Sequence, residues 1–207
     1  MIFEFPKKIK SKKIKIIFSN KQIDNINSKK LEASMEQIHS TNVKIVDEKN
    51  LSSLNTDGIF TMNKDICLKV KTADCLPIFF YNESPFIIGA VHAGWKGLKE
   101  GIIKNAHSAL RYSIQDISSV QIFIGPSISK KNYEVQDEFI DYFGSKFITS
   151  RNGKLFLDLK AVAVSQLKSL GISNVNDAAE CTYENEYYHS YRRDKTTSRL
   201  VGWIYYE

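Results

Sequence analysis

The sequence has few cysteines and histidines and no long hydrophobic run. Its three cysteines, Cys67, Cys75 and Cys181, form an odd, irregularly spaced set, which argues against a disulfide framework. No apolar stretch approaches the roughly 18 residues that a membrane-spanning helix needs. The first lysines are not followed by the long apolar segment of a secretion signal. These absences predict a cytoplasmic protein without a membrane partner, in which each cysteine is either buried or chemically employed.

The composition is that of a folded globular protein. Hydrophobic residues make up 43% of the chain and charged residues 25%. No internal repeat or low-complexity segment is present, and no change in composition marks a linker. A chain of 207 residues is long enough for one sizeable core, so we predict a single domain over residues 1–207.

Positive charge is concentrated near the N-terminus. Residues 7–30 contain nine lysines and one acidic residue, Asp24, so this segment alone (+8) exceeds the net charge of the whole chain (+6). A basic protein suggests a nucleic-acid partner, but the remainder of this chain is slightly acidic. The alternation of Ile14, Ile16 and Phe18 with lysines favours a solvated edge strand protected from aggregation. Attraction of an anionic substrate is a second interpretation, and no nucleic-acid partner is predicted.

Short strand-like runs dominate the first half of the chain, and helical periodicity appears in the second. Helices are predicted over 95–110, 134–143 and 159–170, with Gly144 and Gly171 ending the last two. Because strands and helices do not alternate strictly, we predict an α+β domain with mixed sheets. The predicted strands are 14–18, 43–46, 58–60, 66–71, 77–81, 86–92, 119–124, 155–157 and 200–206.

Three residues have the side chains that soft and borderline metals prefer: His39, Cys75 and His92. Cys75 and His92 stand 17 positions apart and bracket a predicted hairpin, so the two ends of the hairpin can meet. This spacing permits a metal site. From spacing alone, a buried thiol beside a core histidine is an equally good interpretation.

Several motifs resemble those of the YfiH/laccase-domain family, and they follow that family's order from about residue 37 to the end of the sequence. The matching segments are VHAGWKG at 91–97, TADCLP at 72–77, QIHS at 37–40, IGPSI at 124–128, YEV at 133–135 and SYRRD at 190–194. The resemblance implies a layered α/β/β/α domain with mixed β-sheets. It also implies a metal, usually zinc, on His39, Cys75 and His92.

The same resemblance implies a purine nucleoside enzyme. The family is credited with phosphorolysis of adenosine, inosine or guanosine to base and ribose 1-phosphate, with adenosine deamination, and with phenol oxidation. Purine nucleosides and phosphate are therefore the expected partners. Copper is the less favoured metal, because a multicopper cluster needs more imidazoles than four histidines supply.

The expected substrate contacts come from the same motifs. A turn into a helix at 94–97 offers backbone N–H groups to an anion, and arginines add charge-assisted hydrogen bonds. Two candidate substrate-binding residues, Gly94 and Asp74, have equally good structural interpretations. Gly94 permits a tight turn, and Asp74 caps a turn. Two lysines stand where the family often has arginine, which weakens the expected anion contacts because lysine lacks arginine's bidentate fork. The predicted substrate-binding residues are Lys21, Gln37, Asp74, Gly94, Lys96, Arg192 and Arg193.

Other functions fit the same residues. Cys75 and His92 without a metal have the pattern of a cysteine hydrolase or amidase. The family resemblance also allows editing of peptidoglycan precursors. A copper polyphenol oxidase is less favoured for the reason given above, and a non-enzymatic interaction module would require a metal closed by a fourth protein ligand.

Overall fold

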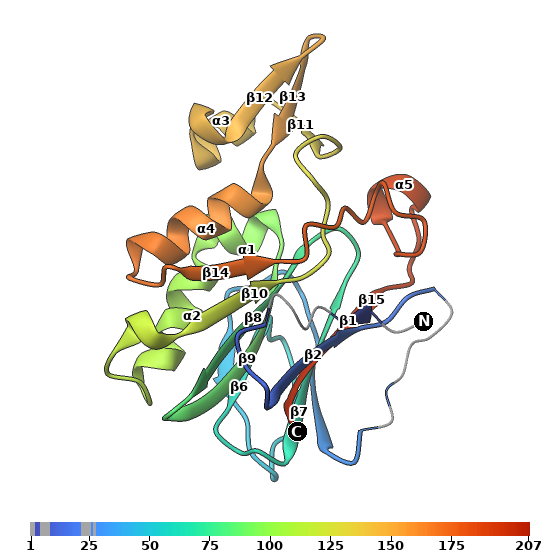
Figure 1. Cartoon of the computed structure of the whole chain (residues 1–207). Coiled ribbons are helices and arrows are strands. Elements are labelled where there is room, and N and C mark those ends of the chain that lie inside the picture. Colours follow the sequence, from blue (N-terminus) through green and yellow to red (C-terminus); the bar gives the residue numbers. More distant parts are fainter. Residues whose placement is uncertain (1–2, 5–8, 22–25, 27) are drawn as a thin grey trace.

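The computed structural model describes residues 3–4, 9–21, 26 and 28–207 (Figure 1). Helices are α1 (Trp95–Glu100), α2 (Ile102–Arg111), α3 (Glu138–Phe143), α4 (Leu159–Ser169) and α5 (Tyr191–Asp194). Strands are β1 (Phe3–Glu4), β2 (Ile14–Phe18), β3 (Leu31–Met35), β4 (Val43–Ile45), β5 (Ser52–Ser53), β6 (Gly58–Thr61), β7 (Ile66–Thr72), β8 (Leu76–Glu83), β9 (Phe86–Ala93), β10 (Gln121–Ile124), β11 (Glu134–Val135), β12 (Ile148–Arg151), β13 (Lys154–Leu157), β14 (Asn174–Asp177) and β15 (Leu200–Tyr206). Within these ranges, no helix has both the length and the apolar character that crossing a membrane requires.

Two six-stranded sheets and one small sheet carry the fold. The first sheet has the order β1-β2-β15-β7-β3-β5, and the second has the order β14-β10-β8-β9-β6-β4. Each contains both parallel and antiparallel pairs, such as β3 with β7 and β15 with β7. The third sheet, β11-β13-β12, stands with α3 at the top of Figure 1. The predicted α+β class with mixed sheets is confirmed.

The second sheet is buried on both faces, which explains why its strands are almost continuously apolar. Along β8, Ile78 and Phe80 pack toward helices α1, α2 and α4, whereas Phe79 and Tyr81 pack toward the first sheet. The layers are therefore helices, second sheet and first sheet (Figure 1). This arrangement holds the β8–β9 hairpin rigidly, and the hairpin positions the site described below.

Two predicted helices differ from the structure. The helix predicted over 95–110 is divided into α1 and α2 at Gly101, whose left-handed φ of 101° breaks the hydrogen-bonding ladder. A hydrophobic period does not reveal such a one-residue break. The helix predicted over 134–143 begins only at Glu138, because Glu134 and Val135 pair with β13 as the short strand β11.

The N-terminal lysine-rich strand is not the edge strand that its alternation predicts. β2 pairs with β15 along its length and with β1 at Ile17 and Phe18, so it lies one position in from the edge. Part of the lysine-rich segment, including residues 7, 8 and 24, lies outside the described residues.

Candidate metal centre

The β8–β9 hairpin brings Cys75 and His92 together at its open end. Pro77 lies opposite His92 in the ladder, and Leu76 lies opposite Ala93, so Cys75 directly precedes the paired segment. His39 arrives from the loop that follows β3. The three candidate ligand atoms all lie within 4.8 Å of one another. The structure therefore brings the three predicted metal ligands to one place.

The geometry of this triad suits a single cation. The Cys75 sulfur lies 3.9 Å from His39 Nε2, and the two imidazole rings meet edge to face with centroids 4.7 Å apart. Ligand atoms around one tetrahedral zinc stand about 3.3–3.8 Å apart, given bond lengths of about 2.0–2.3 Å. Small side-chain rotations would close the site to those distances. The donor set of two nitrogens and one sulfur is also one that zinc prefers.

A close backbone approach forms one wall of the triad at Gly94. A Cβ atom at this position would stand 3.0 Å from both Cys75 Sγ and His39 Cδ2. The φ of Gly94 is −79°, which any residue can adopt. The glycine is therefore required by space beside the two ligands and not by backbone conformation, which distinguishes it from the turn glycine that the sequence also allowed.

In the metal-free triad, Cys75 and His92 stabilise opposite charges on each other. Burial opposes ionisation of Cys75, but the neighbouring His92 and His39 outweigh it and lower the thiol pKa to about 6. Burial likewise opposes charge on His92, yet the Cys75 thiolate and the Asp57 carboxylate raise the His92 pKa to about 9. These two shifts favour the thiolate form of Cys75, which binds metals, and a protonated His92, which must lose a proton before it can bind one.

Asp57, which the sequence did not indicate, completes the centre. Its side chain is fully buried, and its Oδ1 lies 2.8 Å from His92 Nδ1. Hydrogen bonds from His92 and Ser40 outweigh burial and lower the Asp57 pKa to about 2. The one available signal was a charged residue directly before the apolar run 58–60, which by itself does not distinguish a buried acid from a turn residue.

The triad opens into a cavity of about 620 Å³. Three of the predicted substrate residues line it: Gln37, Asp74 and Arg192. The Gln37 amide exchanges two hydrogen bonds with the Lys71 backbone, at 2.6 and 2.8 Å. Arg192 donates to the Glu134 carbonyl at 2.9 Å, and the guanidinium lies 5.2 Å from the ring centroid of Tyr133.

Asp74 acts as a cap. Its Oδ1 accepts a hydrogen bond from the Thr182 hydroxyl at 2.7 Å, and its Oδ2 accepts from the Arg192 N–H at 2.7 Å. The residue has a left-handed φ of 84° and is buried. Both oxygens hold the C-terminal segment against the cavity, so the cap is on the distant helix α5 and not on a turn beside Asp74.

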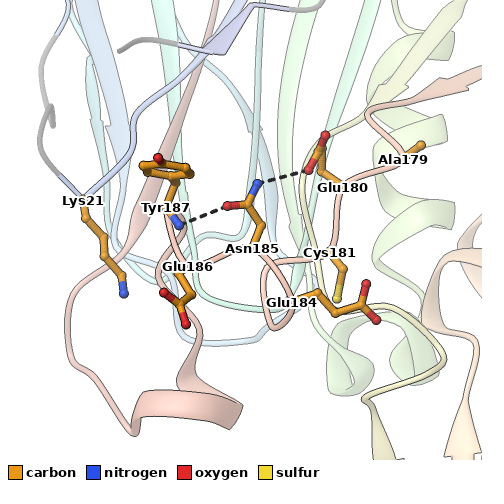
Figure 2. A pocket seen from close by; sticks show the side chains of 8 residues that line it. All are labelled: Lys21, Ala179, Glu180, Cys181, Glu184, Asn185, Glu186 and Tyr187. Carbon is orange, nitrogen blue, oxygen red and sulfur yellow. Dashed lines mark hydrogen bonds between the residues drawn. The ribbon is translucent and has the colours of Figure 1, made fainter.

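The structure does not bring Lys21, Lys96 or Arg193 to the cavity. Lys21 lines a separate cavity of about 720 Å³, which is also lined by Glu180 and Cys181 (Figure 2). The Lys21 ammonium lies 3.7 Å from Asp194 Oδ2. Lys96 is exposed on α1. The Arg193 guanidinium pairs with Asp194 and donates to three backbone carbonyls, those of residues 182, 183 and 188.

Three further cationic side chains line the triad cavity: Lys71, Lys195 and Arg199. Lys71 and Arg199 come from paired strand ends, since Val201 lies opposite Lys71 and Leu200 lies opposite Thr72. Sequence reasoning missed them because Lys71 and Arg199 are separated by more than 120 residues and meet only through the pairing of β7 with β15. The residues next to Lys71 in the sequence do not show that it will meet Arg199 at the cavity wall.

Comparison with known proteins agrees with this architecture. The Neisseria meningitidis protein NMB0706 superimposes with a TM-score of 0.84 over 95% of this chain and 96% of that chain, at 24% identity. YlmD from Geobacillus stearothermophilus gives a TM-score of 0.79 over 85% of this chain and 73% of that chain, at 27% identity. At 24% identity, the likeness to the Neisseria meningitidis protein establishes similarity of fold alone.

Sequence relatives identify the family. The family described as multi-copper polyphenol oxidoreductase laccase matches residues 18–207. A protein of Campylobacter jejuni named purine nucleoside phosphorylase is 42% identical over 174 residues, which cover 83% of this chain and 75% of that protein. The Escherichia coli purine nucleoside phosphorylase YfiH is 30% identical over 178 residues, which cover 83% and 72%. The chain belongs to this laccase-like YfiH family, as the motifs predicted, and the names of its relatives support a purine nucleoside enzyme.

Proposed function

We propose that this protein is a zinc-dependent purine nucleoside phosphorylase that cleaves adenosine, inosine or guanosine to the free base and ribose 1-phosphate. The observation that carries the proposal is the convergence of His39, Cys75 and His92, with ligand atoms within 4.8 Å, beside a cavity of about 620 Å³. The names of the relatives in Campylobacter jejuni and Escherichia coli support the same activity.

The number of ligands favours a catalytic metal. Structural zinc sites are normally closed by four protein ligands, whereas catalytic sites have three and an open position. Among the described residues, this triad is the sole cluster of three or more histidine, cysteine or acidic groups suited to a metal. Zinc bound there would supply a Lewis acid to the reaction. The other two histidines, His107 and His189, do not join the triad, which argues against a multicopper centre.

The charge of the cavity wall supports a phosphate co-substrate. The cationic residues that line it are Lys71, Arg192, Lys195 and Arg199. Among the described lining residues, Asp74 is the sole carboxylate, and both of its oxygens are already occupied. A phosphate oxygen would form the new bond to ribose C1′ while the bond from C1′ to the purine nitrogen breaks. The bonding electron pair leaves with the purine, which takes up a proton.

Aromatic side chains offer apolar surface for a purine. Trp95, Tyr133 and Tyr191 all line the cavity. Trp95 also packs on α3, where its ring is nearly parallel to Tyr142 at 3° and 6.0 Å between centroids. Trp95 thus packs on α3 and also forms part of the cavity wall.

Adenosine deamination is part of the proposal because an activated water beside the same cavity would attack C6 of adenosine and release ammonia. The experiment is to incubate the zinc-loaded protein with adenosine or inosine, with and without phosphate, and to separate the products by chromatography. Free base that forms only with phosphate supports phosphorolysis, and inosine formed from adenosine supports deamination. If a zinc-replete protein forms neither product, both activities are refuted. His92→Ala should abolish turnover, and His107→Ala, on α2, is the matched control.

One observation favours a second candidate, a metal-free cysteine hydrolase. The Cys75 thiol has its pKa lowered to about 6 by two adjacent imidazoles, which is the environment of an activated nucleophile. Metal analysis of the purified protein separates the two functions. A protein that retains full activity after zinc is removed, and loses it when iodoacetamide alkylates Cys75, would favour the hydrolase.

A further inference from the structure

A single carboxylate connects two of the three candidate metal ligands. Asp57 Oδ1 accepts from His92 Nδ1 at 2.8 Å and from the backbone N–H of His39 at 3.1 Å. Asp57 Oδ2 accepts from the N–H and the hydroxyl of Ser40, both at 2.7 Å, and from the N–H of Ile38 at 3.2 Å. Both histidines are therefore fixed relative to one buried group.

The loop that carries His39 is held in an uncommon conformation by this carboxylate. His39 has a left-handed φ of 61°, which costs a non-glycine residue free energy unless its surroundings impose it. The N–H groups of three successive residues, 38–40, point at one anion in the manner of a backbone nest. This charge-assisted set offsets the backbone cost and orients the exposed His39 side chain toward Cys75.

The side chain of His92 is oriented by the same group. An ionised carboxylate can only accept hydrogen bonds, so His92 Nδ1 must donate to it. In the neutral form of His92, which is the form that binds a metal, the lone pair is then located on Nε2. Asp57 itself is fixed by its backbone, since its N–H donates to the Asn42 carbonyl at 3.0 Å and its carbonyl accepts from the His92 N–H at 2.7 Å.

We propose that Asp57 is the positioning residue of the metal centre: through one oxygen atom, it fixes both the spacing of His39 and His92 and the nitrogen that His92 presents. This inference rests on the proposed function only in assuming that the triad binds a metal. Asp57 is not one of the three candidate ligands. It determines metal affinity by preparing the site before the metal arrives.

The substitution Asp57→Asn tests the proposal because both carboxylate oxygens serve donors. An asparagine has one acceptor oxygen and one NH₂ donor. In either orientation, the NH₂ group would face N–H or O–H donors, either those of His92 and His39 or those of residues 38–40. One of the two histidine-bearing segments must then lose its partner.

The measurement is the zinc affinity of the full-length protein, obtained by competition with a chromophoric chelator, together with the absorption spectrum of the cobalt-substituted protein. We expect Asp57→Asn to weaken zinc binding by about 10–100-fold and to alter the cobalt spectrum. Ser40→Ala, which removes one hydroxyl bond to Asp57 and keeps the backbone bonds, should weaken zinc binding by about two- to tenfold. Asp116→Asn, the same change at a capping residue far along the chain, before residues 117–119, is the matched control and should leave the affinity unchanged.

The outcomes separate this inference from the proposed function. Weakened binding by both variants, with thermal unfolding showing that the metal-free proteins remain folded, supports the proposal. If Asp57→Asn does not fold, Ser40→Ala decides: weakened binding supports the positioning role, and unchanged binding overturns it. Zinc affinity and a cobalt spectrum identical to wild type in Asp57→Asn would also overturn it. A wild-type protein that binds no zinc would instead refute the metal-dependent function.

Discussion

The substitution Gly94→Ala should separate fold stability from metal affinity, because the two respond to it in opposite directions. The new Cβ atom would stand 3.0 Å from Cys75 Sγ and 3.0 Å from His39 Cδ2. Ordinary contacts between such atoms are about 3.5–4.0 Å, so one or both ligands must retreat by about half an ångström. Metal–ligand distances in a well-formed site vary by only about 0.2 Å, and we therefore expect zinc binding to weaken by at least about tenfold.

The backbone at Gly94 gives the opposite expectation for stability. Its φ of −79° and ψ of 173° are accessible to alanine, and a compatible glycine-to-alanine change stabilises a protein by about 0.4–1 kcal/mol by restricting the unfolded chain. The metal-free variant should thus unfold at the same or a slightly higher temperature than metal-free wild type. Zinc affinity is measured by chelator competition and unfolding by calorimetry. A variant that binds zinc as tightly as wild type would refute the packing argument.

Three further predictions concern the metal, the cations and the C-terminal segment. Removal of zinc with a chelator should abolish nucleoside cleavage, and added zinc should restore it; activity that survives metal removal, verified by elemental analysis, contradicts the proposed function. Lys71→Ala and Arg199→Ala should each raise the KM for phosphate about tenfold or more, with a smaller change in the KM for inosine, and equal changes in both would argue against a phosphate site at these residues. Arg193→Ala should lower the free energy of unfolding by about 1–3 kcal/mol, since three carbonyls lose their donor, and chemical denaturation provides the measurement.

Local sequence patterns were sufficient for much of the framework. The alternation and continuous apolar character of 77–81 and 86–92 predicted the hairpin whose ends hold Cys75 and His92, and β15 was predicted with its observed bounds. These features depend on neighbouring residues in the chain. The two-residue strand β11 depends on its pairing with β13, so periodicity could not reveal it. The break at Gly101 comes from one left-handed residue inside an otherwise regular hydrophobic period.

The candidate site also contains residues that the sequence indicated and residues that it did not. Motif resemblance indicated the triad, and the structure brings its three members together. Resemblance did not indicate Asp57, whose importance comes from donors on residues 38–40 and 92, nor the cations Lys71, Lys195 and Arg199, which meet through strand pairing. Conversely, Arg193 lies in a family motif, yet its guanidinium is occupied by backbone carbonyls. A motif identifies which residues belong together, and only the packing shows which side chains remain available to a substrate.

The central position of β15 has a consequence for the order of assembly. This strand, Leu200–Tyr206, lies between β2 and β7 and is the last of the described strands to be synthesised. Until it emerges from the ribosome, the β1–β2 pair is not joined to the other described strands of its sheet, and Arg199 is absent from the cavity. A chain that stops before residue 199 would hold all three metal ligands but lack part of the wall around them. A nascent or truncated chain could therefore bind the metal before its cavity is complete, and metal binding alone would not make it active.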